Sequence, residues 1–196
     1  MEAGILLTSH PDPKDEPYPH QAIHARVTRE IIEAEELGFD SIWIAEHHFS
    51  NKYGILTDPF SYLSYLAAKT SRIKLGAAVM VVPLHHPVRI VENAAFVDIL
   101  SNGRFQLGLG SGYRPYEFEG LGIDYEKRRE IQQEAIPLIL DAFTKNACKR
   151  MVPILNSTWR KLTKSFRSPF KSHTLHSLWE QVPRNRCSLP PNMVLV

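Results

Sequence analysis

The 196-residue chain has few cysteines and no long hydrophobic run, and each lack excludes a class of protein. Its two cysteines, Cys148 and Cys187, are too few for a disulfide framework, which favours a reducing compartment. No apolar run approaches the roughly 20 residues that cross a bilayer. The first residues, where Glu2 precedes a short apolar run, do not have the pattern of a secretory signal. We therefore expect a cytoplasmic protein with no membrane partner.

Glycine and acidic residues are scarce in the last quarter of the chain. Residues 1–143 contain 20 acidic and 13 basic side chains, a net charge of −7, and all ten glycines. Residues 144–196 contain one acid, Glu180, and ten bases, a net charge of +9, so the total of +2 is a cancellation. This contrast predicts a folded domain over 1–143 and an irregular basic tail over 144–196.

The basic tail has three interpretations. It could bind nucleic acid, but its charges are interspersed with Pro, Ser and Leu, which argues against a nucleic-acid partner. It could form a small helical extension, with a turn or two over residues 154–162. The abrupt loss of glycines and acids favours a third interpretation, in which a frameshift or a truncated gene left residues that did not evolve to pack on this fold.

Apolar runs and helical periodicities alternate through the first region. Short apolar runs predict strands at residues 3–7, 41–45, 73–82 and 105–109. Apolar residues three and four positions apart predict helices at residues 23–37, 59–68, 87–100 and about 125–143. This alternation is typical of right-handed βαβ units and a parallel sheet. Four units fit an open doubly wound sheet or part of a (β/α)8 barrel, which takes about 250 residues when complete.

Polar or glycine-rich segments follow three of the predicted strands. Residues 46–48 (Glu-His-His) follow the second strand, residues 85–86 (His-His) follow the third, and the glycine-rich residues 108–114 include and follow the end of the fourth. In both candidate folds, active residues gather at the carboxyl ends of the strands. These three segments are therefore the candidate site.

Each segment has more than one chemical interpretation. The histidines could be hydrogen-bonded structural residues, or they could form a metal site with Glu46. Neighbouring strand residues point to opposite faces, so each histidine pair offers one ligand inward, which argues against a metal. Residues 85–86 lie between prolines and are predicted to be loop architecture. The glycines at 108, 110 and 112 suggest a dinucleotide motif, but the predicted next helix begins too late for it.

Several stretches resemble one known family. Residues 38–49 (GFDSIWIAEHHF) closely resemble the second strand of the bacterial luciferase-like monooxygenases. Residues 75–83, 86–89 and 98–105 follow in the order and spacing of that family, and the glycine loop and residues 116–118 continue the resemblance. The resemblance covers about residues 1–143, which would be the N-terminal half of the family's barrel.

The resemblance implies a fold and a reaction. The fold is a (β/α)8 barrel that binds reduced FMN at the carboxyl ends of its strands, here with about four βα units. The reaction combines reduced FMN with O2 to give a flavin C4a-hydroperoxide, which oxygenates a small, aldehyde-like organic substrate. A flavin reductase would supply the reduced FMN. We expect no metal at the site.

The resemblance also assigns residues. His47 matches the family's proposed acid–base histidine, a role that suits an imidazole. Ala78–Val79 matches a non-prolyl cis peptide under the flavin ring. Seven positions match residues that line or bind the flavin: Glu46, Ala78, Val79, Gly110, Ser111, Tyr113 and Arg114. The reactive cysteine of the luciferase α-chain corresponds to Gly110 here, which argues against a luciferase proper.

Two further functions stay open on the sequence. The family's fifth to eighth strands have no counterpart here, so the chain could be a catalytically inactive fragment, or a half-barrel that depends on association with a like chain. Metal-assisted hydrolysis on a barrel would need the histidines to converge. The resemblance favours the flavin-dependent monooxygenase over both.

Overall fold

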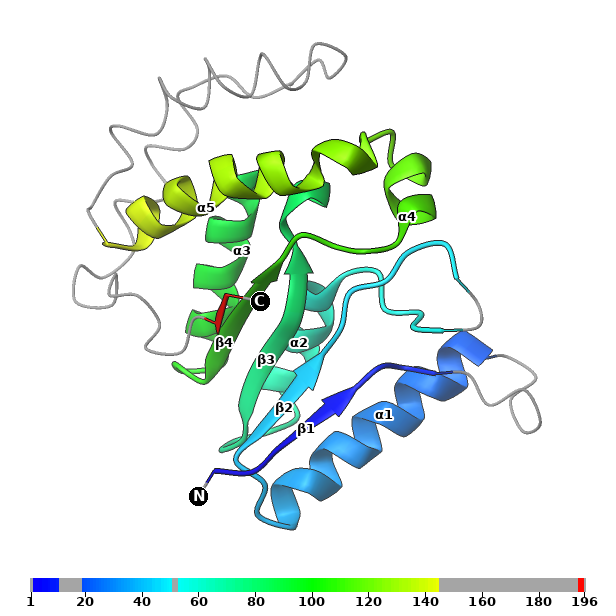
Figure 1. Ribbon diagram of the computed structural model, residues 1–196. Helices are drawn as coiled ribbons and strands as arrows, with labels where there is room; N and C mark the ends of the chain where they lie inside the picture. Colours follow the sequence, from blue (N-terminus) through cyan, green and yellow to red (C-terminus); the bar gives the residue numbers. More distant parts are fainter. Residues whose placement is uncertain (1, 11–18, 51–52, 145–193, 196) are drawn as a thin grey trace.

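The computed structural model describes residues 2–10, 19–50, 53–144 and 194–195, and its centre is a parallel β-sheet (Figure 1). The strands follow one another in chain order: β1 (Gly4–Leu7), β2 (Ser41–Ile44), β3 (Lys74–Val81), β4 (Phe105–Gly110) and β5 (Val194–Leu195). Every neighbouring pair is parallel. The connections are helices: α1 (Pro19–Glu36), α2 (Pro59–Ala67), α3 (Pro87–Leu100), α4 (Pro115–Gly120) and α5 (Arg128–Thr144).

The strand register explains where the core lies. Ile5, Ile42, Leu75 and Phe105 are aligned across the first four strands, and Leu7, Ile44, Ala77 and Leu107 form the next aligned row on the same face. Side chains on a strand alternate between faces, so both rows point to one side of the sheet. The helices bury their apolar stripes with these rows, in a core that includes Ile31, Leu63, Ala94 and Ile139.

Local signals explain where the helices begin. The side chain of Asp58 caps α2 by accepting hydrogen bonds from the backbone N–H groups of Phe60 and Ser61. His86 caps α3 in the same way, with its Nδ1 accepting from the N–H of Val88 at 3.2 Å. A proline opens each of these helices, where its missing N–H costs nothing. The prediction that residues 85–86 are loop architecture is therefore confirmed for His86.

A polar network ties the loops together at the amino end of the sheet. The guanidinium of Arg104 donates to the backbone oxygens of Ser101, Ile73, Ala67 and Thr70 and to the Thr70 hydroxyl. The carboxylate of Glu35 accepts from three successive backbone N–H groups, at residues 71–73. Both side chains satisfy backbone groups that no strand or helix pairs at these points.

The sequence-based prediction holds for the fold class and for most elements. The four predicted strands and four predicted helices are all present, as part of a (β/α)8 barrel. One helix was missed: α4 begins at Pro115, three residues after Gly112. The inference that no helix follows the glycines closely was therefore wrong, although α4 has only six residues. Within the predicted tail, the structure describes Thr144, the last residue of α5, and residues 194–195, which pair with Gly108 and Leu109 of β4. The helical turn predicted over residues 154–162 lies outside the described residues.

Candidate active site

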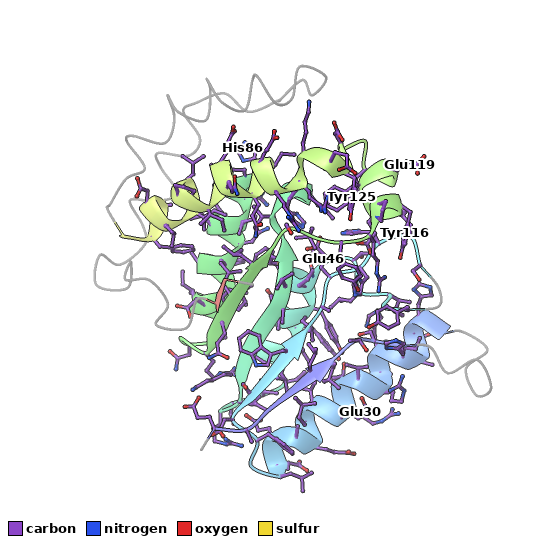
Figure 2. All side chains as sticks on the ribbon, in the orientation of Figure 1. Glu30, Glu46, His86, Tyr116, Glu119 and Tyr125 are labelled. Carbon is purple, nitrogen blue, oxygen red and sulfur yellow. The ribbon has the colours of Figure 1, made fainter. Side chains whose placement is uncertain are left out.

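Glu46 lies at the carboxyl end of the sheet, just after β2, and its side chain is completely buried (Figure 2). Its Oε1 accepts hydrogen bonds from two imidazoles, His48 Nε2 at 2.8 Å and His85 Nε2 at 2.6 Å. Its Oε2 accepts from the backbone N–H of Val81, the last residue of β3, at 2.8 Å. One carboxylate therefore joins the ends of two neighbouring strands.

The histidines keep this buried carboxylate ionised. Burial raises the pKa of Glu46, but the hydrogen bonds from His48 and His85 and the charge of His85 outweigh it, so the net pKa lies below its usual value. Burial lowers the pKa of His85, but the hydrogen bond and charge of Glu46 raise it above its usual value. The two shifts have one origin, because each of these groups favours the charged form of the other.

His47 is held by a second buried carboxylate, Glu117 of α4. His47 Nδ1 lies 3.3 Å from Glu117 Oε1, and both side chains are buried. The same oxygen accepts from the backbone N–H of His48 at 3.0 Å. Because a carboxylate accepts hydrogen bonds, Nδ1 is assigned as the protonated ring nitrogen, and Nε2 is the nitrogen left to exchange a proton. Glu117 therefore fixes the orientation of the His47 ring.

Gly54 and Tyr53 shape the surroundings of His47. A Cβ atom on Gly54 would lie 2.2 Å from His47 Cδ2, and the φ of +70° at this position also favours glycine. The ring of Tyr53 lies 5.7 Å from that of His47, and the ring of Tyr113 lies 6.3 Å away at 86°. The imidazole is therefore fixed between a close-packed backbone and two aromatic rings.

Arg114 caps this aromatic group. Its guanidinium lies 4.5 Å from the centre of the Tyr53 ring and donates to the Tyr53 carbonyl and to the hydroxyls of Tyr113 and Tyr116. It also lies 3.6 Å from Glu117 Oε1. These contacts place a cation beside the His47–Glu117 pair and use several donors of the guanidinium within the protein. Tyr113 and Tyr116 remain largely exposed.

Ala78, Val79 and Gly110 meet between β3 and β4. The Ala78–Val79 peptide bond is cis, as the family resemblance implied. A Cβ on Gly110 would lie 2.4 Å from Val79 Cγ2, so glycine is needed for this close approach. Ser111 follows Gly110 and is half-buried. Like Glu46 and His47, these residues lie toward the carboxyl ends of the strands.

The structure brings most of the predicted site together and adds three residues. Glu46, His47 and the segments around residues 78–79 and 110–114 all lie at the carboxyl ends of β2, β3 and β4. Glu117 was not predicted, and His48 lies in a predicted segment but had no role assigned to it. The prediction that His85 is only loop architecture was wrong. A carboxylate three residues after Arg114, in the segment that carries the family resemblance, was the available signal for Glu117.

Among the residues that the structure describes, no group of three or more His, Cys, Asp or Glu side chains is arranged to hold a metal ion. Over the same residues, no helix is long and apolar enough to cross a membrane.

Parallel strands that lie side by side in chain order, with helices between them, are typical of a barrel-type α/β protein. The chain belongs to the luciferase-like monooxygenase family, whose profile matches residues 1–162. The alkanal monooxygenase alpha chain of Photorhabdus laumondii is 32% identical over 144 residues, which are 74% of this chain and 39% of that protein.

Solved structures agree on the fold. The monooxygenase RslO1 from Streptomyces bottropensis superposes with a TM-score of 0.67 at 26% identity, over 74% of this chain and 44% of that one. The oxygenating constituent of 3,6-diketocamphane monooxygenase from Pseudomonas putida, solved in complex with FMN, gives a TM-score of 0.66 at 20% identity, over 73% and 39% of the two chains. The chain thus spans about two fifths of the length of the proteins it matches.

Proposed function

We propose that this chain carries the flavin side of the active site of a flavin-dependent monooxygenase, with His47 as its acid–base residue. The observation that supports this most directly is the buried His47–Glu117 pair, which lies at the same end of the sheet as the cis Ala78–Val79 peptide and the loop after Gly110. We propose reduced FMN as the cofactor, O2 as co-substrate and a small, aldehyde-like substrate. Family membership and the alkanal monooxygenase relatives support these choices.

The residues present fit a flavin. Gly110 has no side chain, so the Val79 side chain packs directly against the end of β4 at the point where the ring would lie. The Oγ of Ser9, in the segment after β1, is buried without a hydrogen-bond partner among the described residues, and could accept or donate one with a polar ring edge. Ala78, Val79 and Gly110 would lie against the ring. Glu46, Ser111, Tyr113 and Arg114 would border it.

The protein's own part in the reaction is proton transfer and positioning. Bound reduced flavin would supply the two electrons with which one atom of O2 enters the substrate and the other leaves as water. His47 would hold or release a proton at Nε2, because Glu117 occupies its Nδ1 side. A flavin reductase would act as the separate source of reduced FMN.

A second candidate function rests on the open edge of the sheet. β1 is the last strand on its side among the described residues, and its Leu6 is 57% exposed. An unpaired strand edge with an exposed apolar residue favours association. The chain would then be inactive alone and would complete its site by pairing with a like chain.

A flavin titration of the full chain separates the two candidates. We expect FMN to bind with micromolar affinity, monitored by flavin fluorescence, and coenzyme F420 as a parallel probe tests a deazaflavin. With a flavin reductase and decanal, we expect oxygen consumption that falls about 10²- to 10⁴-fold in His47→Ala. His86→Asn is the matched control, because asparagine also caps a helix.

The outcomes are distinct. FMN binding with His47-dependent oxygen consumption by the monomer supports the enzyme. Binding or activity that rises steeply with protein concentration, together with a dimer in sedimentation, supports the pairing candidate. A folded chain that binds neither flavin contradicts the proposal.

A further inference from the structure

His85 makes a contact that the proposed reaction does not use. It follows the 3-10 turn of residues Val82–Leu84, and its Nε2 donates to Glu46 Oε1 at 2.6 Å. Its side chain is 29% exposed, so it can exchange protons with solvent, whereas Glu46 is completely buried. The contact spans 39 residues of sequence and joins the segment after β2 to the segment after β3.

The buried carboxylate of Glu46 needs a compensating charge. An unpaired carboxylate is costly to bury, and its cost falls when a cation and hydrogen bonds satisfy both oxygens. The titratable groups that face His85 are Glu46, His48, which shares the same carboxylate oxygen, and Asp58 at the start of α2. The two carboxylates favour the protonated form of His85.

The second carboxylate oxygen of Glu46 binds β3, the strand that contains the cis peptide. Oε2 accepts from the N–H of Val81, two residues after Val79. If Glu46 lost its charge or turned away, the end of β3 would lose this hydrogen bond, and the Ala78–Val79 segment would lose a support. His48 cannot replace this link between strands, because it lies only two residues from Glu46 on the same segment.

We propose that His85 is a positioning residue: as the counter-charge of Glu46, it fixes the Val81 N–H and thereby the Ala78–Val79 segment against which the flavin would lie. The idea that a flavin is the ligand rests on the function proposed above. The chain of contacts from His85 through Glu46 to Val81 belongs to the protein itself and can be tested without any ligand.

The ligand-free test is an NMR titration of the full chain. Between pH 6 and pH 9, we expect the amide signal of Val81 to shift with the same midpoint as the imidazole signals of His85. In His85→Gln, whose amide donates at every pH but never carries a charge, this titration of Val81 disappears. His86→Asn keeps it, since His86 caps α3 and the cluster is intact. A Val81 signal that ignores His85, or that titrates unchanged in His85→Gln, overturns the proposal.

The second test measures FMN affinity over the same pH range by fluorescence. We expect wild-type affinity to fall about five- to tenfold as His85 loses its proton, since one charge-assisted hydrogen bond is weakened. His85→Gln and His85→Ala should both show flat profiles, and His85→Ala should bind about tenfold more weakly at every pH than wild type does with His85 protonated. Identical profiles for wild type and His85→Gln overturn the role toward flavin. If wild type binds no FMN, the proposed function fails, and the NMR titration still decides the role of His85.

Discussion

Charged side chains at the two ends of the sheet make different kinds of contact. At the carboxyl end they bind mainly one another: Glu46 binds two histidines, and Glu117 lies between His47 and Arg114. At the amino end they bind the backbone, because Arg104 donates to four carbonyl oxygens and Glu35 accepts from three successive N–H groups.

This difference separates stability from chemistry. A side chain that satisfies backbone groups fixes a loop and leaves nothing to exchange with a ligand. A carboxylate–imidazole pair keeps a titratable proton, which catalysis can use. In barrel folds the carboxyl end of the strands holds the active site and the amino end contributes stability. Substitutions at the amino end should therefore change stability without changing flavin binding.

The largest expected effect is that of Glu117→Ala at the carboxyl end. It leaves the N–H of His48 unpaired and removes the carboxylate beside Arg114 and His47, so we expect a loss of about 3–5 kcal/mol in the free energy of unfolding. Urea denaturation measures it. Glu119→Ala, an exposed residue of the same helix, is the control and should change stability by less than about 0.5 kcal/mol. Equal effects of the two substitutions would contradict the buried network.

Arg104→Ala tests the amino end. The substitution leaves several backbone oxygens without their donor, so we expect the free energy of unfolding to fall by about 2–3 kcal/mol. FMN affinity of the folded fraction should stay within about twofold of wild type, because Arg104 touches no site residue. Arg89→Ala is the control, since the exposed Arg89 pairs with the partly buried Glu92 in a contact whose expected contribution is below about 1 kcal/mol. If Arg104→Ala altered the surroundings of Tyr113 or Gly110, the two ends of the sheet would not be separable.

The free energy of unfolding should depend on pH because Glu46 and His85 form a titratable pair. The pKa of Glu46 is lower in the folded protein than in the unfolded chain, so ionised Glu46 stabilises the fold at pH values above its usual pKa. This stabilisation is lost as the pH falls through the lowered pKa. The pKa of His85 is higher in the folded protein than in the unfolded chain, so protonated His85 stabilises the fold fully at pH values below its usual pKa. This stabilisation is lost as the pH rises through the raised pKa. We expect the pair to stabilise most between these limits. Subtracting the pH profile of His85→Gln from that of wild type isolates the alkaline loss, and a difference that does not vary with pH would contradict it.

The smallest expected effect is that of Glu35→Gln. Burial raises the pKa of Glu35, but hydrogen bonds from Ile73, Arg72 and Ser71 outweigh it, and the net pKa is lowered. An amide oxygen still accepts these hydrogen bonds, so we expect a loss of only about 0.5–1 kcal/mol at pH 7. Glu36→Gln, exposed on the next position of α1, should have no measurable effect. Thermal unfolding of both variants at pH 7 and pH 4 measures the difference, which should shrink at the lower pH.

Periodic elements could be predicted from the sequence, and contacts between distant segments could not. The strands and the long helices follow from apolar runs and from three- and four-residue spacing, as in the stripe of α1 around Ile31. Helix α4 escaped prediction because six residues are too few to show a period. The cis peptide at Ala78–Val79 came from the family resemblance, and nothing in the local residues indicates it.

The site shows the same division. His47 and Glu46 could be predicted because they follow a strand directly and carry the family resemblance. Glu117 could not, because it meets His47 only after the chain has added two further βα units, 70 residues later. His85 was assigned to the loop because prolines flank it, whereas its ring reaches back to Glu46. His86, the next residue, does serve the loop as the cap of α3.

The most direct test of the account is the residue-by-residue response of the amide NMR spectrum to FMN. We expect the signals of residues 78–81 and 110–114, with that of His47, to shift or broaden as FMN is added, while those of residues 71–73 and of Arg104 do not move. A well-dispersed spectrum that FMN leaves unchanged, or one in which the amino end of the sheet responds instead, would contradict it.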